Sequence, residues 1–190
     1  FKKGPDYIDP AWLTRASGRP CWNLDFFTMG HDEIHSCFEE RRQDADVAVV
    51  EGNKGLFDGL DVEGSDSNAA LAVRLGLPVI LVIDVTGITR GIAPLLTGYA
   101  SFDPEVQIVG VILNRVAGPR QESKLRAAIE RYSDLPVLGA IGRTSGLDIK
   151  ERHLGLVPGN EDPDALARID RIADVVEAGV DLDAVLAFTA

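Results

Sequence analysis

The sequence predicts an α/β protein in which a mostly parallel sheet is flanked by helices on both faces. From residue 45 onward, short continuous apolar runs alternate with helix-like segments. Such runs are typical of strands buried on both faces, and single helices between successive strands indicate parallel pairing. The expected strands are residues 47–50, 78–83, 107–113 and 136–141, with a shorter one at 154–157, and the expected helices are 67–75, 91–101, 120–131 and 163–178.

Residues with known preferences at helix ends support these boundaries. Ser67 and Asp162 are suited to begin helices, because their side-chain oxygens accept hydrogen bonds from free backbone N–H groups. Gly76 and Gly179 are suited to end helices, because glycine adopts the left-handed conformation without strain.

The first 45 residues differ from the rest of the chain. They are rich in Gly and Pro, so we expect a loop-rich insertion with one helix near residues 32–42. Residues 1–20 carry a net charge of +2, whereas the remainder carries −13. A locally basic lobe suits an anionic ligand, and ordinary scatter of surface charge explains the difference equally well.

Composition bounds the class of protein. The 190 residues suit one domain, and the 45% of apolar residues suffices for a core. The net charge of −11 argues against nucleic acid or an anionic membrane surface as the main partner. Only Cys21 and Cys37 occur, which excludes a disulfide-rich scaffold and favours a cytoplasmic location. No apolar run reaches the roughly 18–20 residues of a membrane span.

Polar residues follow three of the expected strands. Glu51 comes after strand 47–50, Asp84 after strand 78–83, and Asn114 with Arg115 after strand 107–113. Ligands of parallel sheets gather at the carboxyl ends of the strands. A carboxylate at such an end is placed to hold Mg²⁺ beside phosphates, although any one of these residues could simply cap a turn. Three of them together favour a site.

Two further segments combine residues that commonly line ligand sites, namely glycines, carboxylates and a lysine. The loop after Glu51 contains Gly52 and Gly55, which let its backbone approach a ligand closely, and ends near Asp58. Residues 3–10 place two carboxylates three positions apart beside a lysine, and prolines stiffen both ends of this segment. The residues concerned are Lys3, Asp6 and Asp9.

The phosphate-loop pattern GxxxxGK(S/T) does not occur in the 190 residues. The chain begins with Phe1 rather than Met, and Phe1–Gly4 looks like the end of a strand. We therefore expect a piece of a longer protein, with a phosphate-binding loop directly upstream of Phe1.

A zinc motif is the main alternative for the first 45 residues. His31 and His35 would share one face of a helix, as in HExxH metalloproteases, with Cys37 nearby. Asp32 replaces the usual glutamate and is short for a general base. Acidic residues in a first helical turn explain the segment more simply.

Several runs together resemble one known family. They are FKKGPDYIDPAW at residues 1–12, GRPCWNLD at 18–25, VVEGNKGLFDG at 49–59, ILNRV at 112–116 and ERHLGLVP at 151–158. These runs are similar, in order, to the N-terminal ATP-binding domain of the cobyrinic acid a,c-diamide synthases, a P-loop NTPase-like domain related to dethiobiotin synthetase. The resemblance implies that residues 1–190 are this synthetase domain without its phosphate loop, and that the C-terminal glutaminase domain is absent from the chain.

The resemblance also implies an activity. Such a ligase uses ATP, Mg²⁺ and glutamine to amidate peripheral carboxylates of a corrin-type macrocycle through an acyl phosphate, in cobalamin biosynthesis. The expected partners are a tetrapyrrole polycarboxylate, the glutaminase domain and, as a homodimer, a second copy of the chain. The piece alone would be inactive.

Roles for individual residues are carried over from the same resemblance. Glu51 matches a Mg²⁺ ligand, and Asp6 and Asp9 match an acidic pair near Mg²⁺ or the substrate carboxylate. Lys3 matches a lysine near the phosphates or the acyl phosphate, and Asp58 a loop aspartate that positions substrate. Asn114, with Arg115, matches the position that recognises adenine in dethiobiotin synthetase.

One departure from the family concerns the substrate. Many members that act on cobyrinic acid have Val-Met where this chain has Asn53-Lys54. In this respect the chain resembles relatives that amidate sirohaem or nickel-sirohydrochlorin. Lys54 could meet a further carboxylate of the tetrapyrrole or be a solvated charge. Two alternatives remain. A non-catalytic, partitioning-type ATPase is disfavoured because such proteins lack the GPDYIDP cluster, and dethiobiotin synthetase itself is disfavoured because it lacks the glycine-flanked Asp58 loop.

Overall fold

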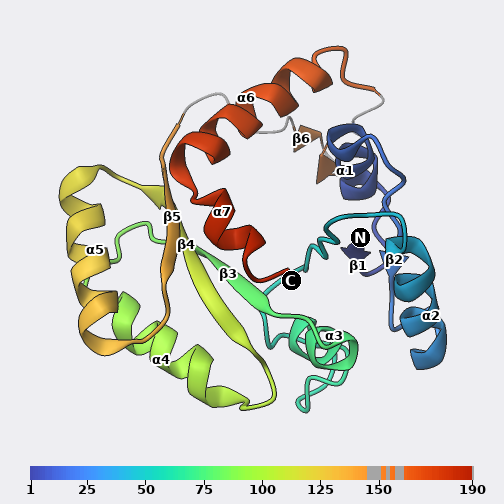
Figure 1. Ribbon diagram of the computed structural model, residues 1–190, viewed down its shortest axis with the longest axis horizontal. Coiled ribbons are helices and arrows are strands. Elements are labelled where there is room, and N and C mark those ends of the chain that lie inside the picture. Colours follow the sequence, from blue (N-terminus) through green and yellow to red (C-terminus); the bar gives the residue numbers. More distant parts are fainter. Residues whose placement is uncertain (145–150, 153–154, 157–160, 190) are drawn as a thin grey trace. The chain divides into compact units, whose positions relative to one another are not determined.

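The computed structural model describes residues 1–144, 151–152, 155–156 and 161–189 (Figure 1). The chain divides into two compact units. The first comprises Phe1–Leu75 with Leu147–Arg171, and the second comprises Gly76–Gly146 with Ile172–Ala190.

The second unit contains the parallel sheet that the sequence predicts. Its strands are β3 (Val79–Asp84), β4 (Ile108–Val116) and β5 (Val137–Gly142), in the order β3-β4-β5 with both pairs parallel. Figure 1 shows two helices on one side of this sheet, α4 (Ile92–Phe102) and α5 (Pro119–Tyr132). The fold class, an α/β arrangement with parallel strands flanked by helices, is confirmed.

Burial explains why this unit follows the predicted pattern. The largest fully buried side chains in it are Val85, Ile92, Leu96, Val111, Leu113, Leu125 and Ile129. Each such side chain stabilises the fold by roughly 1.5–3 kcal/mol relative to exposure. They come from the middle strand, from the turn after β3 and from the inner faces of both helices, so the core lies between sheet and helices.

The first unit is built from short elements. Strands β1 (Lys2–Lys3) and β2 (Asn23–Leu24) pair in parallel, and β6 (Glu151–Arg152) pairs antiparallel with β7 (Gly155–Leu156). The described part of the predicted strand 154–157 is therefore extended, and residues 154 and 157 lie outside the described residues. The helices within this unit are α1 (Ile8–Ser17), α2 (His31–Arg42) and α3 (Asn68–Leu75).

The remaining helices involve the end of the chain. Helix α6 (Ala165–Gly179) begins in the first unit and ends in the second, and α7 (Leu182–Leu186) belongs to the second. The backbone N–H of Asp181 donates to the carbonyl of Leu138 at 2.8 Å, which holds the segment before α7 against β5. No helix among the described residues is long and apolar enough to cross a membrane.

Helix α1 was not expected, because the first 45 residues read as loops around their prolines. Pro10 is the third residue of α1, where the backbone N–H it lacks would have no partner within the helix. Gly18 follows the helix with a φ of 67° and donates its N–H to the Thr14 carbonyl. The proline that suggested a loop therefore sits where a helix tolerates it.

The prediction of a strand at residues 47–50, buried on both faces, is wrong. Residues 47–50 pair with no strand, the following residue Glu51 forms a single parallel β bridge with Lys2, and Val49 is 70% exposed. The segment is nevertheless tied to the start of the chain. Glu51 N–H donates to the Phe1 carbonyl at 2.9 Å, and Lys3 N–H donates to the Glu51 carbonyl at 2.8 Å. These bonds place Glu51 beside β1.

Candidate functional site

Three carboxylates of the first unit gather around one buried lysine. The Lys2 ammonium nitrogen lies 2.7 Å from Asp9 Oδ2 and 3.6 Å from Glu51 Oε1. It also donates to the Gly52 carbonyl at 3.2 Å. Asp6 belongs to the same cluster, because its charge and that of Asp9 both act on Lys2. Below, "acidic cluster" means Asp6, Asp9 and Glu51 around Lys2.

Different elements bring these side chains together. Lys2 lies in β1, Asp9 is the second residue of α1, and Glu51 bridges to β1. Asp6 lies in the turn between β1 and α1, where its Oδ1 accepts the N–H of Ile8 at 2.8 Å. The side-chain amide of Asn23 braces the turn, since it donates to the carbonyls of Gly4 and Asp6 at 2.6 Å each.

Burial, hydrogen bonds and neighbouring charges shift the pKa values of three members of the cluster. Burial would lower the pKa of Lys2, but the hydrogen bond to Asp9 and the nearby carboxylates outweigh it, so this pKa is raised. Burial raises the pKa of Glu51, and the Lys2 charge offsets this only in part. Burial would raise the pKa of Asp6, but hydrogen bonds from Ile8 N–H and with Asp9 hold it below its usual value.

The carboxylates of the acidic cluster suit a metal ion that is also bound by the oxygens of a phosphate ligand. Among residues 1–144 and the other described segments, no group of three His, Cys, Asp or Glu is placed to hold a metal by itself. The centre of the acidic cluster is taken by the Lys2 ammonium. Mg²⁺, however, usually takes only one or two protein carboxylates and completes its shell with phosphate oxygens and water. Glu51, 47% exposed, together with an aspartate of the cluster, fits that requirement.

Lys3 has different surroundings from Lys2. It is only 6% exposed, and within the described part of the chain its ammonium forms no ion pair or hydrogen bond. Burial lowers its pKa, and the charge of Lys54 lowers it further, whereas Asp66 and Asp25 oppose this. The lysine that meets Asp9 is therefore Lys2, which the sequence interpretation passed over. The alternation of a strand allows only one of two adjacent lysines to face a given side, and the sequence does not show which.

The glycine-rich loop is held by a single asparagine. Asn68, the first residue of α3, accepts the N–H of Asn53 at 3.1 Å and donates to the carbonyls of Asn53 and of Gly55, the latter at 3.1 Å. A side chain at Gly52 would be 2.9 Å from Asn68 Cγ, so only glycine allows this approach. Asp58 Oδ2 accepts the N–H of Gly55 at 3.1 Å, so the aspartate folds back on its own loop.

The second unit carries the other polar residues that follow strands. Asp84 and Asn114 are partners in the β3–β4 register, and Arg115 Nη1 lies 3.7 Å from Asp84 Oδ2. Asn114 Oδ1 accepts the N–H of Arg115 at 2.9 Å. Arg115 has a φ of 61°, and its carbonyl accepts Arg143 Nε at 3.3 Å. Left-handed backbone at a non-glycine residue is uncommon and is often found at functional sites.

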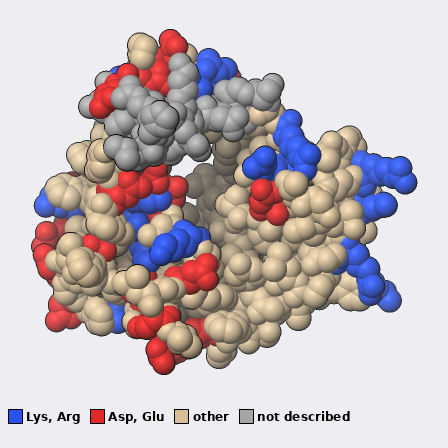
Figure 2. Space-filling view, turned by 180° about the vertical axis from the view of Figure 1, so that it is seen from behind, with Lys and Arg blue, Asp and Glu red and all other residues tan. Residues whose placement is uncertain are grey.

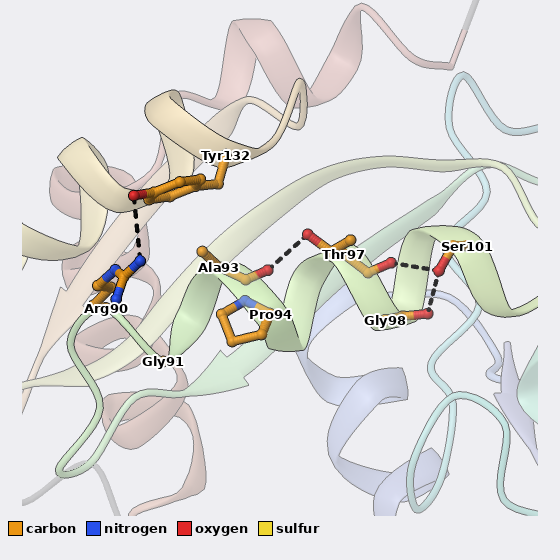
Figure 3. Close-up of a pocket in the computed structure, with 8 residues that line it drawn as sticks. All are labelled: Arg90, Gly91, Ala93, Pro94, Thr97, Gly98, Ser101 and Tyr132. Carbon is orange, nitrogen blue, oxygen red and sulfur yellow. Dashed lines mark hydrogen bonds between the residues drawn. The ribbon is translucent and has the colours of Figure 1, made fainter.

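The second unit also contains a cavity of about 740 Å³ beside α4 (Figure 3). Arg90 donates to the Tyr132 hydroxyl at 3.4 Å at one side of it. The hydroxyls of Thr97 and Ser101 bond back to carbonyls of their own helix, so they offer little to a ligand. None of the residues that the sequence singled out lines this cavity.

The surface charge agrees with the composition. On the face drawn in Figure 2, the described Lys and Arg side chains occur in small separate groups, some of them beside Asp and Glu. Binding to a nucleic-acid backbone calls for a basic patch or stripe on one face. Among the described residues on this face, Figure 2 shows no such patch or stripe, and the chain as a whole carries a net charge of −11.

Comparison with known proteins defines the class of protein. A family model described as an AAA domain matches residues 26–150. The chain therefore belongs to this family of nucleotide-binding α/β domains, and its fold is P-loop NTPase-like.

Comparison with individual proteins shows which members of this family the chain is similar to. Over its whole length the chain is 53% identical to a cobyrinate a,c-diamide synthase of Magnetococcus marinus. It is 46% identical over 96% of its length to a hydrogenobyrinate a,c-diamide synthase of Brucella ovis, and 40% identical over 98% to a cobyrinate a,c-diamide synthase of Listeria innocua. The resemblance to the cobyrinic acid a,c-diamide synthase family is thus confirmed. The chain spans 41–42% of the length of these relatives.

Proposed function

We propose that this chain is the ATP-binding synthetase domain of a ligase that amidates peripheral carboxylates of a corrin-type tetrapyrrole. The observation that supports this most directly is the convergence of Asp6, Asp9 and Glu51 on one buried lysine. ATP, with magnesium offsetting its charge, would supply the γ-phosphoryl group that turns a substrate carboxylate into an acyl phosphate with release of ADP, and ammonia would then displace inorganic phosphate to leave the amide. We further propose that a glutaminase domain supplies this ammonia from glutamine in the cytoplasm.

The acidic cluster supplies the metal ligands in this proposal. Glu51 is the main protein ligand, because it is half exposed and only loosely paired with Lys2, and Asp6 is the second. Asp9 accepts the shorter contact from Lys2 and keeps the ammonium in place, which leaves the outer carboxylates oriented toward the ligand.

The remaining roles rest on the surroundings of each residue. Lys3 carries a positive charge with no ion-pair partner among the described residues, as a group that meets phosphate oxygens should. Gly52 and Gly55 allow the loop backbone close to the ligand, and Asp58 positions the substrate from that loop. In the second unit we assign adenine recognition to Asn114 and Arg115.

The test uses the full-length protein with ATP, Mg²⁺, glutamine and cobyrinate or hydrogenobyrinate, with ADP release and product mass as readouts. We expect amidated product from the wild type. Glu51→Gln should lower tetrapyrrole-dependent ADP release by about 100-fold and raise the Mg²⁺ concentration required. Glu130→Gln, an exposed glutamate in α5, is the matched control and should have no effect. Normal turnover of Glu51→Gln at low Mg²⁺ would refute the metal assignment.

A second substrate is favoured by one specific feature. Asn53-Lys54 stands where many cobyrinate-specific members have Val-Met. Sirohydrochlorin and its metal complexes are therefore tested in the same assay, and their faster amidation would identify the protein as the corresponding amidase.

A further inference from the structure

The carboxyl end of β4 contains a β bulge. The register between β4 and β5 shifts after Leu113, and Asn114 with Arg115 stands opposite a single residue of β5. An extra residue in one strand interrupts the ladder of backbone hydrogen bonds and redirects the side chains beside it, and such bulges are frequent next to active sites. This bulge consists of the two residues to which the proposed function assigns the nucleotide base.

Side chains supply hydrogen bonds where the bulge interrupts the ladder. Arg115 has left-handed backbone, with a φ of 61°, which a non-glycine residue keeps only where the surrounding structure imposes it. Its N–H donates to Asn114 Oδ1 at 2.9 Å, and its carbonyl accepts a hydrogen bond from Arg143 Nε at 3.3 Å. The backbone N–H of Arg143 donates to the Val116 carbonyl at 3.0 Å. Arg143, the residue after β5, therefore holds the bulge through both its backbone and its side chain.

The hydrogen bond from Arg115 also fixes the orientation of the Asn114 amide. Asn114 is half-buried, and its carbonyl accepts the N–H of Val85 at 3.0 Å, which ties its backbone to the turn after β3. Its Nδ2 donates to no described residue and keeps contact with solvent. The amide thus offers a free donor beside an oxygen with one lone pair left. The edge of adenine that carries the N7 acceptor and the N6 amine is complementary to such a pair.

We propose that Arg143 is a positioning residue for recognition of the nucleotide base. By donating from Nε to the Arg115 carbonyl, Arg143 holds the bulge in the geometry in which the Asn114 amide meets adenine. The inference rests on the proposed function, in which Asn114 and Arg115 recognise adenine. Arg143 acts through the backbone of Arg115 and needs no contact with the nucleotide, so the property that matters is its Nε donor and not its positive charge.

Two neutral substitutions separate the hydrogen bond from the charge. Arg143→Gln keeps an N–H donor at the same distance along the side chain as Nε, whereas Arg143→Met places a methyl group there. Calorimetry on the full-length protein with Mg²⁺ measures its affinity for ADP and for 7-deaza-ADP, in which a C–H group replaces the N7 acceptor. The ratio of the two affinities reports the contact at N7, which a general loss of stability would not change.

We expect the wild type to bind ADP about fivefold more tightly than 7-deaza-ADP, since one hydrogen bond to the base contributes roughly this much. Arg143→Gln should keep most of this preference. Arg143→Met should lower it below about twofold by weakening ADP binding alone, and Asn114→Ala should abolish it. Arg131→Met, which removes an exposed arginine in the last turn of α5, is the matched control and should bind both nucleotides like the wild type.

The melting temperatures of both Arg143 variants should lie within about 2 °C of the wild type. Arg115 is exposed, so water can bind to its carbonyl when the Nε donor is removed. A weaker preference for ADP in a variant of normal stability therefore reports the position of the bulge rather than unfolding.

The outcomes distinguish this inference from the proposed function. Equal losses of preference in Arg143→Gln and Arg143→Met would refute the role of the Nε hydrogen bond, and an unchanged preference in Arg143→Met would refute it as well. If the wild type binds ADP and 7-deaza-ADP equally, the positioning role is refuted while nucleotide binding stands. If the wild type binds neither, the nucleotide site of the proposed function is itself contradicted, and the inference fails with it.

Discussion

Two adjacent lysines of nearly equal burial should differ in how much stability the same substitution costs. Lys2 and Lys3 are 4% and 6% exposed, but only Lys2 is paired, with Asp9 at 2.7 Å and Glu51 at 3.6 Å. Removing one partner of a buried ion pair typically costs about 3–5 kcal/mol. Because Asp9 and Glu51 are 28% and 47% exposed, water screens the charges left behind, and we expect Lys2→Met to cost about 2 kcal/mol.

Lys3→Met should cost much less. Burial lowers the pKa of Lys3, so the charged form of Lys3 is less favourable in the folded state than in the unfolded chain. Replacing an unpaired buried ammonium with an apolar side chain of similar length removes that penalty, so the free energy of unfolding should change by no more than about 1 kcal/mol or increase. Urea denaturation of both variants measures the difference. A cost of about 2 kcal/mol corresponds to a melting-temperature decrease of roughly 4–8 °C in a chain of this size.

The pH dependence of the stability lost in Lys2→Met gives an independent check of the Lys2 ion pairs. The pKa of Lys2 is raised in the folded state, so its stabilising contribution is complete below its unfolded pKa and is lost only as the pH rises through the folded value. In Lys2→Met the carboxylates lose their counter-ion and bind protons more readily when folded. The stability lost should therefore be larger at pH 7 than near pH 4, where carboxylates begin to protonate. Equal losses at both pH values, or equal losses for the Lys2 and Lys3 variants, would refute this account of the cluster.

Two other residues give predictions for the loops. Asn68→Ala should lower the free energy of unfolding by about 2–3 kcal/mol, because three backbone groups of the glycine-rich loop lose their hydrogen-bond partner. Urea denaturation measures this change, and an unchanged free energy of unfolding would contradict the prediction. Gln121→Ala should lower the free energy of unfolding by about 2 kcal/mol. The Gln121 amide donates to the carbonyls of Val85 and Ile88 and accepts a hydrogen bond from the N–H of Ala117. Hydrogen exchange at the Ala117 amide should therefore become faster, and unaltered exchange there would contradict the prediction.

The parts of the fold that could be predicted are those decided by local sequence. Strands β3, β4 and β5 are continuous apolar runs, and a slip of one residue would turn the buried side chains of a strand out of the core. Residues 47–50 have the same composition, yet they form no strand, because strand pairing depends on a neighbour that composition does not reveal. The sequence did not predict helix α1, because Pro10 indicated a loop. A proline breaks a helix in its interior but is tolerated in the first turn, where Pro10 lies.

The candidate site could be predicted in its acidic members but not in its geometry. The spacing of Asp6 and Asp9, and the position of Glu51 after an apolar run, follow from the sequence. The choice between Lys2 and Lys3 does not, because it depends on how β1 is rotated against β2 and the Glu51 segment. The loop contacts of Asn68 were also missed, since they join residues 13–15 positions apart.

The Lys2 ammonium at the centre of the acidic cluster bears on how the protein would handle divalent ions. Three carboxylates with an internal counter-ion keep their arrangement by themselves, so emptying the site does not require the neighbouring turns to rearrange. Under the proposed function, magnesium would enter with each incoming nucleotide and depart with the spent one, and treatment with a chelator would leave the melting temperature of the isolated chain unchanged.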